Sequence, residues 1–230
     1  MITSRDNEKL KLVRKLASRR WRDKLGLFVA EGEDLVDAAI AAGIEPVELL
    51  VAGENVTRKL LADVASLAHP PRVVGVFLRD DLPRGVDRPA GLALWRVADP
   101  GNLGTLVRAA DAFGAFVALS TGCADPTGPK ALRASMGALF RVPTLGFDEA
   151  PGRRVALVPR GGELIHDLDL EGQTTFVLGA EREGLPDEVL ARCAARATIP
   201  LESEAESLNV AMAGTVALYE LSRRAGSPSP

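Results

Sequence analysis

The first residues that could do chemistry lie in the stretch ADPGNLGTLVRAADAFG, which contains Asn102 and Arg108. It joins an apolar, strand-like run to a helical pattern, and ligands of open α/β sheets bind at such junctions. Gly101 and Gly104 would let the backbone turn tightly and approach a ligand closely. The spacing is neither GxGxxG nor a P-loop, so it does not specifically indicate a dinucleotide or a nucleoside triphosphate. Taken alone, Arg108 fits an ordinary surface arginine.

Two further motifs carry polar side chains at similar junctions. FVLGAEREGLPDEV ends an apolar run on Gly179 and Glu181, at the position where open sheets bind ligands. IPLESEAESLNVAMAGTVALYEL places Ser207 and Asn209 at the start of the last helical pattern. Ser207 is a credible N-cap of that helix, whereas Asn209 is a poor helix former. Each motif alone also fits a plain turn or cap, so the three gain meaning only together.

The patterns around the motifs predict an α/β protein in two parts. A segment rich in proline and glycine, residues 80–91, separates a domain at 1–84 from a second domain at 90–226. Apolar runs predict strands at 27–30, 47–51, 72–78, 92–97, 116–120, 155–158 and 174–178. Helical spacing predicts helices at 4–22, 35–42, 56–68, 105–114, 130–139 and 207–224, the first capped by Ser4. This alternation favours a mostly parallel sheet that is covered on both faces in the second part.

Composition restricts the class of protein. The 230 residues are 47% hydrophobic and 26% charged, as in a globular protein of one or two domains. No run approaches the roughly 20 apolar residues that span a membrane, and the first residues lack a signal-peptide core. We therefore expect a cytoplasmic protein without a membrane partner. Cys123 and Cys193 stand alone, and with only two histidines the sequence predicts reduced cysteines and no metal site.

Positive charge is concentrated near the amino terminus. Residues 5–24 contain nine Lys or Arg and three acids, a local net charge of +6 in a chain whose net charge is −3. Such a segment favours contact with a polyanion, because each neutralised phosphate releases counterions. A solvated basic helix would show the same charge, and the contrast with the remaining −9 keeps RNA binding open.

In their order and spacing, the three motifs together resemble the signature motifs of the SpoU (TrmH) family of RNA ribose 2′-O-methyltransferases, which belongs to the SPOUT superfamily. DPTGPKALRASMGALFR, residues 125–141, resembles the same family. FVAEGEDLVDAAIAAGIEPVELLVAG, residues 28–53, is similar to its L30e-like substrate-binding domain. The resemblance implies a small L30e-like α/β domain, followed by a SPOUT α/β domain with a C-terminal trefoil knot.

The resemblance also implies S-adenosyl-L-methionine as cofactor. The knot would form the cofactor pocket, and the matching positions there are Leu178, Gly179, Ile199, Leu201 and Leu208. The polar positions that match the family's catalytic site are Asn102, Arg108, Glu181, Ser207 and Asn209. Arg108 corresponds to the catalytic arginine. Because a guanidinium stays protonated, we expect it to bind the phosphate beside the target ribose and lower the hydroxyl's pKa, with direct proton abstraction as the alternative.

The family resemblance further implies a homodimer, in which Arg108 serves the site of the other subunit. The basic segment would then bind the RNA substrate. The side chains expected to contact RNA are Arg14, Lys15, Arg19 and Arg20. Ribosomal RNA is the preferred target, with transfer RNA or a non-catalytic RNA-binding role as alternatives. The lack of GxGxxG argues against a dinucleotide oxidoreductase. The spacing of Asn102 and Arg108 and the SLN triplet disfavour a base-methylating SPOUT enzyme.

Overall fold

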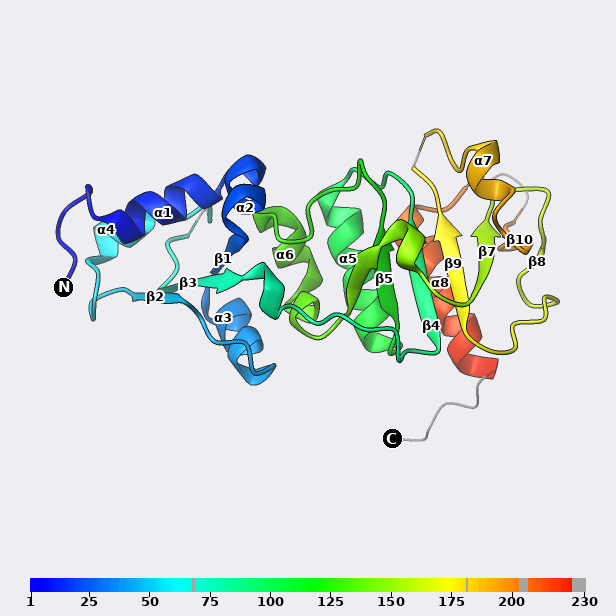
Figure 1. Cartoon of the computed structure of the whole chain (residues 1–230), viewed down its shortest axis with the longest axis horizontal. Helices are drawn as coiled ribbons and strands as arrows, with labels where there is room; N and C mark the ends of the chain where they lie inside the picture. Colours follow the sequence, from blue (N-terminus) through cyan, green and yellow to red (C-terminus); the bar gives the residue numbers. More distant parts are fainter. Residues whose placement is uncertain (68, 181, 203–206, 225–230) are drawn as a thin grey trace.

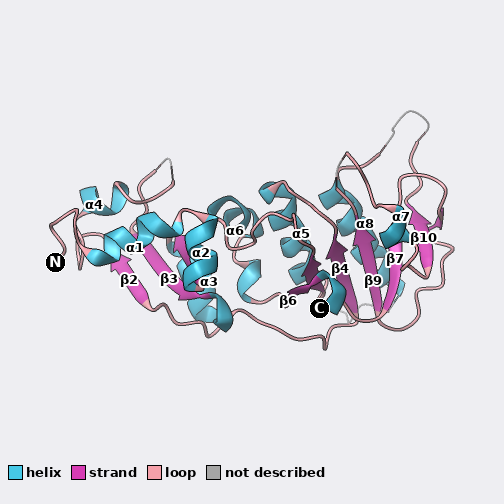
Figure 2. Cartoon of the chain, turned by 45° about the horizontal axis from the view of Figure 1, so that its top comes forward, coloured by secondary structure: helices cyan, strands magenta, loops and turns pink. Residues whose placement is uncertain are grey.

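The chain forms two β-sheets in an elongated molecule. The computed structural model describes residues 1–230 except 68, 181, 203–206 and 225–230. A three-stranded antiparallel sheet has the order β1-β3-β2, and a seven-stranded sheet has the order β6-β5-β4-β9-β7-β10-β8 with every neighbouring pair parallel. Figures 1 and 2 show the small sheet toward the amino-terminal end and the large sheet toward the other. The predicted α/β class, with a parallel sheet in the second part, is confirmed.

Most of the predicted strands form close to where the apolar runs place them. The small sheet contains β1 (Leu27–Glu31), β2 (Glu48–Val51) and β3 (Val73–Leu78). The large sheet contains β4 (Ala90–Leu94), β5 (Phe116–Leu119), β6 (Thr144–Gly146), β7 (Arg153–Leu157), β8 (Glu163–Leu164), β9 (Thr174–Leu178) and β10 (Ala195–Thr198). The sequence did not predict β6 and β8, because two or three residues are too few to show a hydrophobic period. It did not predict β10 because the sequence ARAT contains an arginine and no apolar run.

The helices cover the sheets and join them. They are α1 (Glu8–Leu16), α2 (Arg19–Leu25), α3 (Glu33–Ala41), α4 (Arg58–Ala62), α5 (Pro100–Ala112), α6 (Pro129–Ser135), α7 (Asp187–Leu190) and α8 (Val210–Arg224). The prediction of a single helix at 4–22 is wrong, because α1 and α2 are separate helices. The Asn7 carboxamide oxygen caps α1 by accepting from the Lys9 amide at 3.0 Å, and Ser18 is extended, so that a second helix starts after it.

Helix α5 starts earlier than predicted, within the stretch 98–104 that was expected to be a loop. The Asp99 carboxylate caps it by accepting from the Asn102 amide at 2.8 Å, and this hydrogen bond lowers the pKa of Asp99. Pro100 takes the first helical position, where no amide proton is needed. Gly104 therefore lies inside a helix, where an added Cβ would be 2.4 Å from the Ala131 carbonyl oxygen of α6. It permits close packing of two helices, which corrects its expected role beside a ligand.

We expect Gly104→Ala to destabilise the protein although alanine is the better helix former. The propensity gain is about 1 kcal/mol, whereas overpacking a tight contact costs about 1–3 kcal/mol. The backbone of α6 lies too close to yield cheaply, with the Ala134 Cβ also 2.5 Å from the new atom. Urea unfolding measures the net loss, with the exposed Thr105→Ala of the same helix as control. A more stable Gly104→Ala protein would contradict this account of the α5–α6 contact.

One hydrophobic core runs from the small sheet into the large one. Phe28 of β1 and Phe77 of β3 contact Phe140, which follows α6, with ring centroids 5.8–6.1 Å apart. All three rings are buried and belong to the same cluster as the core beneath the large sheet. Aromatic pairs at these separations add to the free energy of area burial. The two sheets are therefore packed as one body through this phenylalanine cluster.

A buried ion cluster lies beside the phenylalanines. Asp125, before α6, accepts hydrogen bonds from Arg22 of α2 and Arg79 after β3, both at 2.8 Å, and from the Thr127 hydroxyl at 2.7 Å. Burial alone would raise the pKa of Asp125, but the Thr127 hydrogen bond and the two guanidinium charges outweigh it and lower the pKa below its usual range. Arg22 belongs to the basic segment at residues 5–24, yet it is only 4% exposed. It holds the two halves together and does not face solvent.

Candidate functional site

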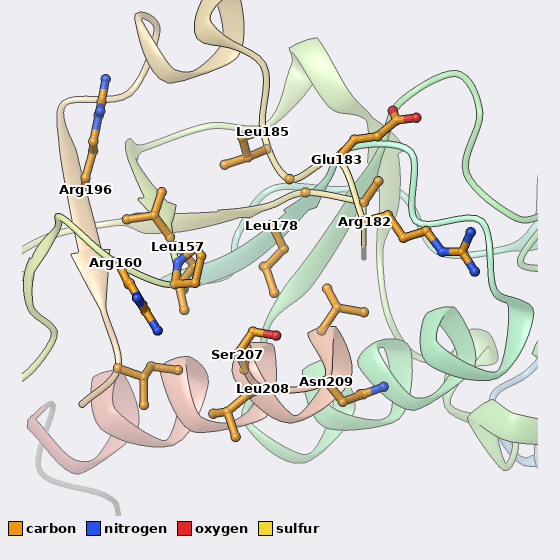
Figure 3. A pocket seen from close by; sticks show the side chains of 18 of the residues that line it. Leu157, Arg160, Leu178, Arg182, Glu183, Leu185, Arg196, Ser207, Leu208 and Asn209 are labelled. Atoms are coloured by element: carbon orange, nitrogen blue, oxygen red, sulfur yellow. The ribbon is translucent and has the colours of Figure 1, made fainter. Parts of the chain in front are cut away.

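A pocket of about 820 Å³ opens where three parallel strands end and the last helix begins (Figure 3). Its lining follows β7, β9 and β10 at their carboxyl ends and includes the start of α8. The residues are Leu157–Arg160, Leu178–Ala180, Arg182–Leu185, Leu190, Arg196, Ile199, Leu201, Ser207–Val210 and Ala213. Its volume suits an organic ligand, and its place at the carboxyl edge of a parallel sheet is where such ligands bind.

The residues predicted to hold a cofactor all line this pocket. They are Leu178, Gly179, Ile199, Leu201 and Leu208. An added Cβ at Gly179 would lie 2.3 Å from the backbone carbon of Gly184, so the loop after β9 folds closely back on itself. Six leucines and Ile199 form an apolar part of the wall, and polar atoms enter mainly from the loops. This combination suits a ligand with one flat apolar part and one polar part.

The amino end of α8 is organised by Asn209. Its Oδ1 accepts from the amides of Ala211 at 2.9 Å and Met212 at 3.4 Å. Because the helix begins at Val210, Asn209 is its N-cap, and the prediction that Ser207 has this position is wrong. Ser207 is exposed and lines the pocket instead.

The first and third motifs meet at this helix end. The Asn209 Nδ2 donates to Oδ1 of Asn102 at 3.0 Å, which joins α5 to the start of α8 beside the pocket. The second motif lies across the pocket, through Leu178 and Gly179 (Figure 3). The structure therefore brings the three motifs to one place. Glu181, the carboxylate predicted from the second motif, lies outside the described residues.

We expect Asn209→Ala to lower the free energy of unfolding by about 1 kcal/mol, because the cap of α8 is lost. Asn209→Asp should retain most of that stability, since a carboxylate caps equally well and interacts favourably with the helix dipole. Asn102→Ala serves as control, because it removes the bond between α5 and α8 and leaves the cap in place. Guanidinium unfolding followed by circular dichroism compares them. Equal losses for Asn209→Ala and Asn209→Asp would contradict the capping role.

Arg108 is placed differently from Ser207 and Asn209, which line the pocket. It is exposed on α5 and does not line the pocket of its own chain. Its guanidinium makes no hydrogen bond or ion pair with any residue that the structure describes. It is therefore available to a ligand or to another chain.

The pocket also contains three arginines that sequence reasoning missed: Arg160, Arg182 and Arg196. Arg160 lies in the turn VPRGG directly after β7, and Arg182 lies inside the second motif. A search for cations at strand ends would have found Arg160 and Arg182. Arg196 lies within β10, whose sequence ARAT has no apolar run that would predict a strand, so no comparable signal marked it.

The four basic residues predicted to contact RNA are exposed on and beside α1 and α2. Arg14 donates to the Arg5 carbonyl at 2.9 Å, Lys15 lies 5.3 Å from the Trp21 ring centroid, and Arg19 donates to the Cys123 carbonyl at 3.1 Å. Arg19 also pairs with Asp23 at 3.7 Å, and Arg20 is exposed beside it. Together they form a basic surface on the small-sheet half.

Cys123 is buried and Cys193 half-buried, and both are free thiols. Burial raises the pKa of Cys193. Among the described residues, no three His, Cys, Asp or Glu side chains lie together as metal ligands do, and no helix has the length and apolar character to cross a membrane.

The two halves of the chain match two known protein families. Residues 89–219 match the SpoU rRNA Methylase family, and residues 7–75 match the MRM3-like substrate binding domain. The first match contains the entire pocket, and the second contains the basic surface.

Similar proteins extend over nearly the whole chain. The 23S rRNA (guanosine(2553)-2′-O)-methyltransferase RlmP of Bacillus subtilis is 28% identical, over 96% of this chain and 98% of its own. A 23S rRNA (uridine(2479)-2′-O)-methyltransferase of Streptomyces viridochromogenes is 30% identical, over 97% and 92%. The crystal structure of an AdoMet-bound rRNA methyltransferase from Sinorhizobium meliloti superposes with a TM-score of 0.85 at 30% identity, covering 97% of both chains.

Proposed function

The chain belongs to the SpoU rRNA methylase family, and we propose that it methylates a ribose 2′-hydroxyl of 23S ribosomal RNA. As a family member it is an S-adenosylmethionine-dependent RNA 2′-O-methyltransferase with a SPOUT fold. The observation that carries the proposal is that the second and third motifs line one pocket and the Asn102–Asn209 hydrogen bond holds the first motif beside it. Relatives that act on 23S rRNA align over almost their full length, which favours this target over transfer RNA.

The pocket fits S-adenosylmethionine. Its volume suffices for the cofactor, and Ile199, Leu201 and Leu208 offer apolar walls for the adenine. Gly179 lets the loop after β9 approach closely. We further propose that the strand ends and the start of α8 here belong to a trefoil knot, as in the SPOUT superfamily.

The chemistry is a direct displacement by the ribose oxygen. When bound, S-adenosylmethionine supplies a methyl group that its positive sulfur has already activated. The chain must therefore position the ribose, assist the loss of its proton and exclude water. We propose that the Arg108 guanidinium binds the phosphate beside the target ribose and lowers the pKa of the ribose 2′-hydroxyl. Asn102, Ser207 and Asn209, together with Glu181, would hold Arg108, the ribose and the loops in register.

A homodimer would complete the site. Arg108 lies outside the pocket of its own chain, and α8 presents apolar side chains to solvent. Met212 is 62% exposed, Val216 37% and Tyr219 56%, and their spacing of four and three residues puts them on one helix face. A second copy that covers this face would bury them and bring its own Arg108 to the pocket. Residues 1–84 would then serve as the RNA-binding domain of each subunit, and a ribosomal substrate implies a cytoplasmic location.

We expect charge reversal of Arg14, Lys15, Arg19 and Arg20 to weaken RNA binding and to flatten its salt dependence. Each phosphate contact that is lost removes about one unit from the slope of log affinity against log salt. Filter binding of 23S rRNA fragments at several salt concentrations measures both quantities. Cofactor affinity should stay unchanged, since the pocket lies in the other half. Unaltered RNA binding would contradict the role of this basic surface.

The function itself is tested by mapping 2′-O-methyl groups in RNA from cells with and without the protein. We expect one 23S rRNA position to lose its methyl group, and the purified protein to restore it with labelled S-adenosylmethionine. If the protein methylates transfer RNA only, then transfer RNA and not 23S rRNA is its target. Failure to bind the cofactor in calorimetry would instead favour a non-catalytic RNA-binding role.

A further inference from the structure

We propose that Arg160 binds the carboxylate of the cofactor's amino-acid part, a role that rests on the proposed function and names one subsite within it. Arg160 follows β7 and lines the pocket with the leucines and Ser207. It belongs to none of the three signature motifs. Three observations carry the inference: the turn that holds it, the direction in which it points, and its lack of a partner among the described residues.

The turn that contains Arg160 is fixed against the neighbouring strand. Gly161 has a φ of 76°, in the left-handed region that glycine adopts without strain. The Gly162 amide donates to the Thr198 hydroxyl at 3.0 Å, and an added Cβ at Gly162 would lie 2.8 Å from the backbone of Ala197. Gly161 and Gly162 thus allow the loop to pack directly against β10. This packing fixes the backbone of Arg160 at the pocket wall.

The direction of the side chain distinguishes Arg160 from the other two arginines. In Figure 3 its guanidinium points along the pocket toward the side on which Ser207 and Leu208 lie. Arg196 points away from α8, and Arg182 points away from the centre of the pocket. Of these three cations, Arg160 is therefore the one aimed at a ligand that occupies the space between β7 and α8.

No group on the described part of the chain neutralises Arg160. Glu183 also lines the pocket, but it pairs with Arg96 at 3.7 Å. The side chain of Arg160 is exposed and makes no hydrogen bond or ion pair with a described residue. A guanidinium left free beside an apolar ligand site suits a planar anion, which it binds through two parallel hydrogen bonds.

The chemistry of the cofactor provides one such anion. S-adenosylmethionine and its product S-adenosylhomocysteine each contain a single carboxylate, at the end opposite to the adenine. With the adenine between the leucine and isoleucine walls, the amino-acid part must lie toward the polar rim. 5′-Methylthioadenosine has the same nucleoside and thioether but lacks the carboxylate. Its affinity therefore reports on the nucleoside part of the site without the carboxylate subsite.

Calorimetric titration of the full-length protein with S-adenosylhomocysteine and with 5′-methylthioadenosine tests the assignment. We expect Arg160→Ala to weaken S-adenosylhomocysteine binding about 10- to 100-fold, the range for a hydrogen-bonded charge pair. Binding of 5′-methylthioadenosine should stay within about twofold. Arg160→Lys should be intermediate, because it keeps the charge and loses the two-pronged geometry. Arg192→Ala, which removes an exposed arginine outside the pocket lining, should leave both affinities unchanged.

Several results would overturn the proposal. If Arg160→Ala binds S-adenosylhomocysteine as the parent protein does, Arg160 has no part in the subsite. If both ligands weaken equally, Arg160 acts on the nucleoside or on the pocket's shape. If only RNA affinity falls, its anion is a phosphate. A parent protein that binds neither ligand would contradict the proposed function itself, and that result is distinct from a failure of Arg160 alone.

Discussion

Replacing Arg108 by alanine should lower kcat for RNA methylation about 100- to 1000-fold while cofactor binding stays intact. Removal of one well-placed donor to a developing anion costs about this much. The side chain is exposed on α5 and lies outside the pocket, so neither the fold nor the cofactor site depends on it. Single-turnover assays with labelled S-adenosylmethionine measure the rate, and calorimetry measures the binding. Arg108→Lys keeps the charge, but we expect it to recover only part of the rate.

Mixing two inactive variants decides whether Arg108 acts on the other subunit. One variant is Arg108→Ala, and the other is Ile199→Trp, whose added bulk fills the pocket that Ile199 lines. If the arginine acts across a dimer, each mixed dimer contains one complete site. Statistical exchange then restores about a quarter of the parent activity. A mixture that stays inactive after verified exchange would show that Arg108 serves its own pocket, and a monomeric mass in light scattering would rule out the dimer.

Asp125→Ala should be the most destabilising single change at the junction of the two halves, with a loss of about 3–5 kcal/mol. Its removal leaves the buried Arg22 guanidinium, and Arg79 beside it, without their shared carboxylate. Asp125→Asn should lose less, because its amide oxygen still accepts a hydrogen bond. Urea unfolding monitored by tryptophan fluorescence gives the free energies.

The control for this prediction is an ion pair of similar length at the surface. Asp80 and Arg84 are 2.9 Å apart, and both are largely exposed. Asp80→Ala should leave the unfolding midpoint unchanged, because solvent and salt screen such a pair. If both variants lose equal stability, burial does not explain the effect of Asp125. If Asp125→Ala is fully stable, water enters the cluster and solvates the two guanidiniums.

The sequence predicted the large parallel sheet because its central strands are buried on both faces and read as continuous apolar runs. Phe176–Leu178 and Leu92–Leu94 are examples, each buried throughout. It failed at β8, which has two exposed residues, and at the start of α5, where proline and glycine suggested a loop. Gly104 illustrates the failure at the start of α5. The glycine is required there because α6, a helix later in the chain, packs closely against it, and the sequence of the motif alone does not show this contact.

The candidate site was predictable to the extent that its residues share motifs. Leu178, Gly179, Ile199, Leu201 and Leu208 do meet around one pocket. The Asn102–Asn209 hydrogen bond could not be predicted, since it joins residues 107 positions apart and depends on how α8 returns to α5. The burial of Arg22 was likewise hidden, because its neighbours in sequence are exposed cations and its carboxylate partner lies in the other half.

The phenylalanine cluster has a consequence for changing the RNA target of such an enzyme. Exchanging the amino-terminal half for that of a relative is an obvious way to redirect methylation, and the segment at 80–91 is the natural splice point. Yet Phe28 and Phe77 would leave with the exchanged half, while Phe140 stays behind in the catalytic half. A chimera can therefore remain rigid only if the incoming half presents rings of matching shape. Exchanging only the exposed basic residues of α1 and α2 would leave this cluster intact.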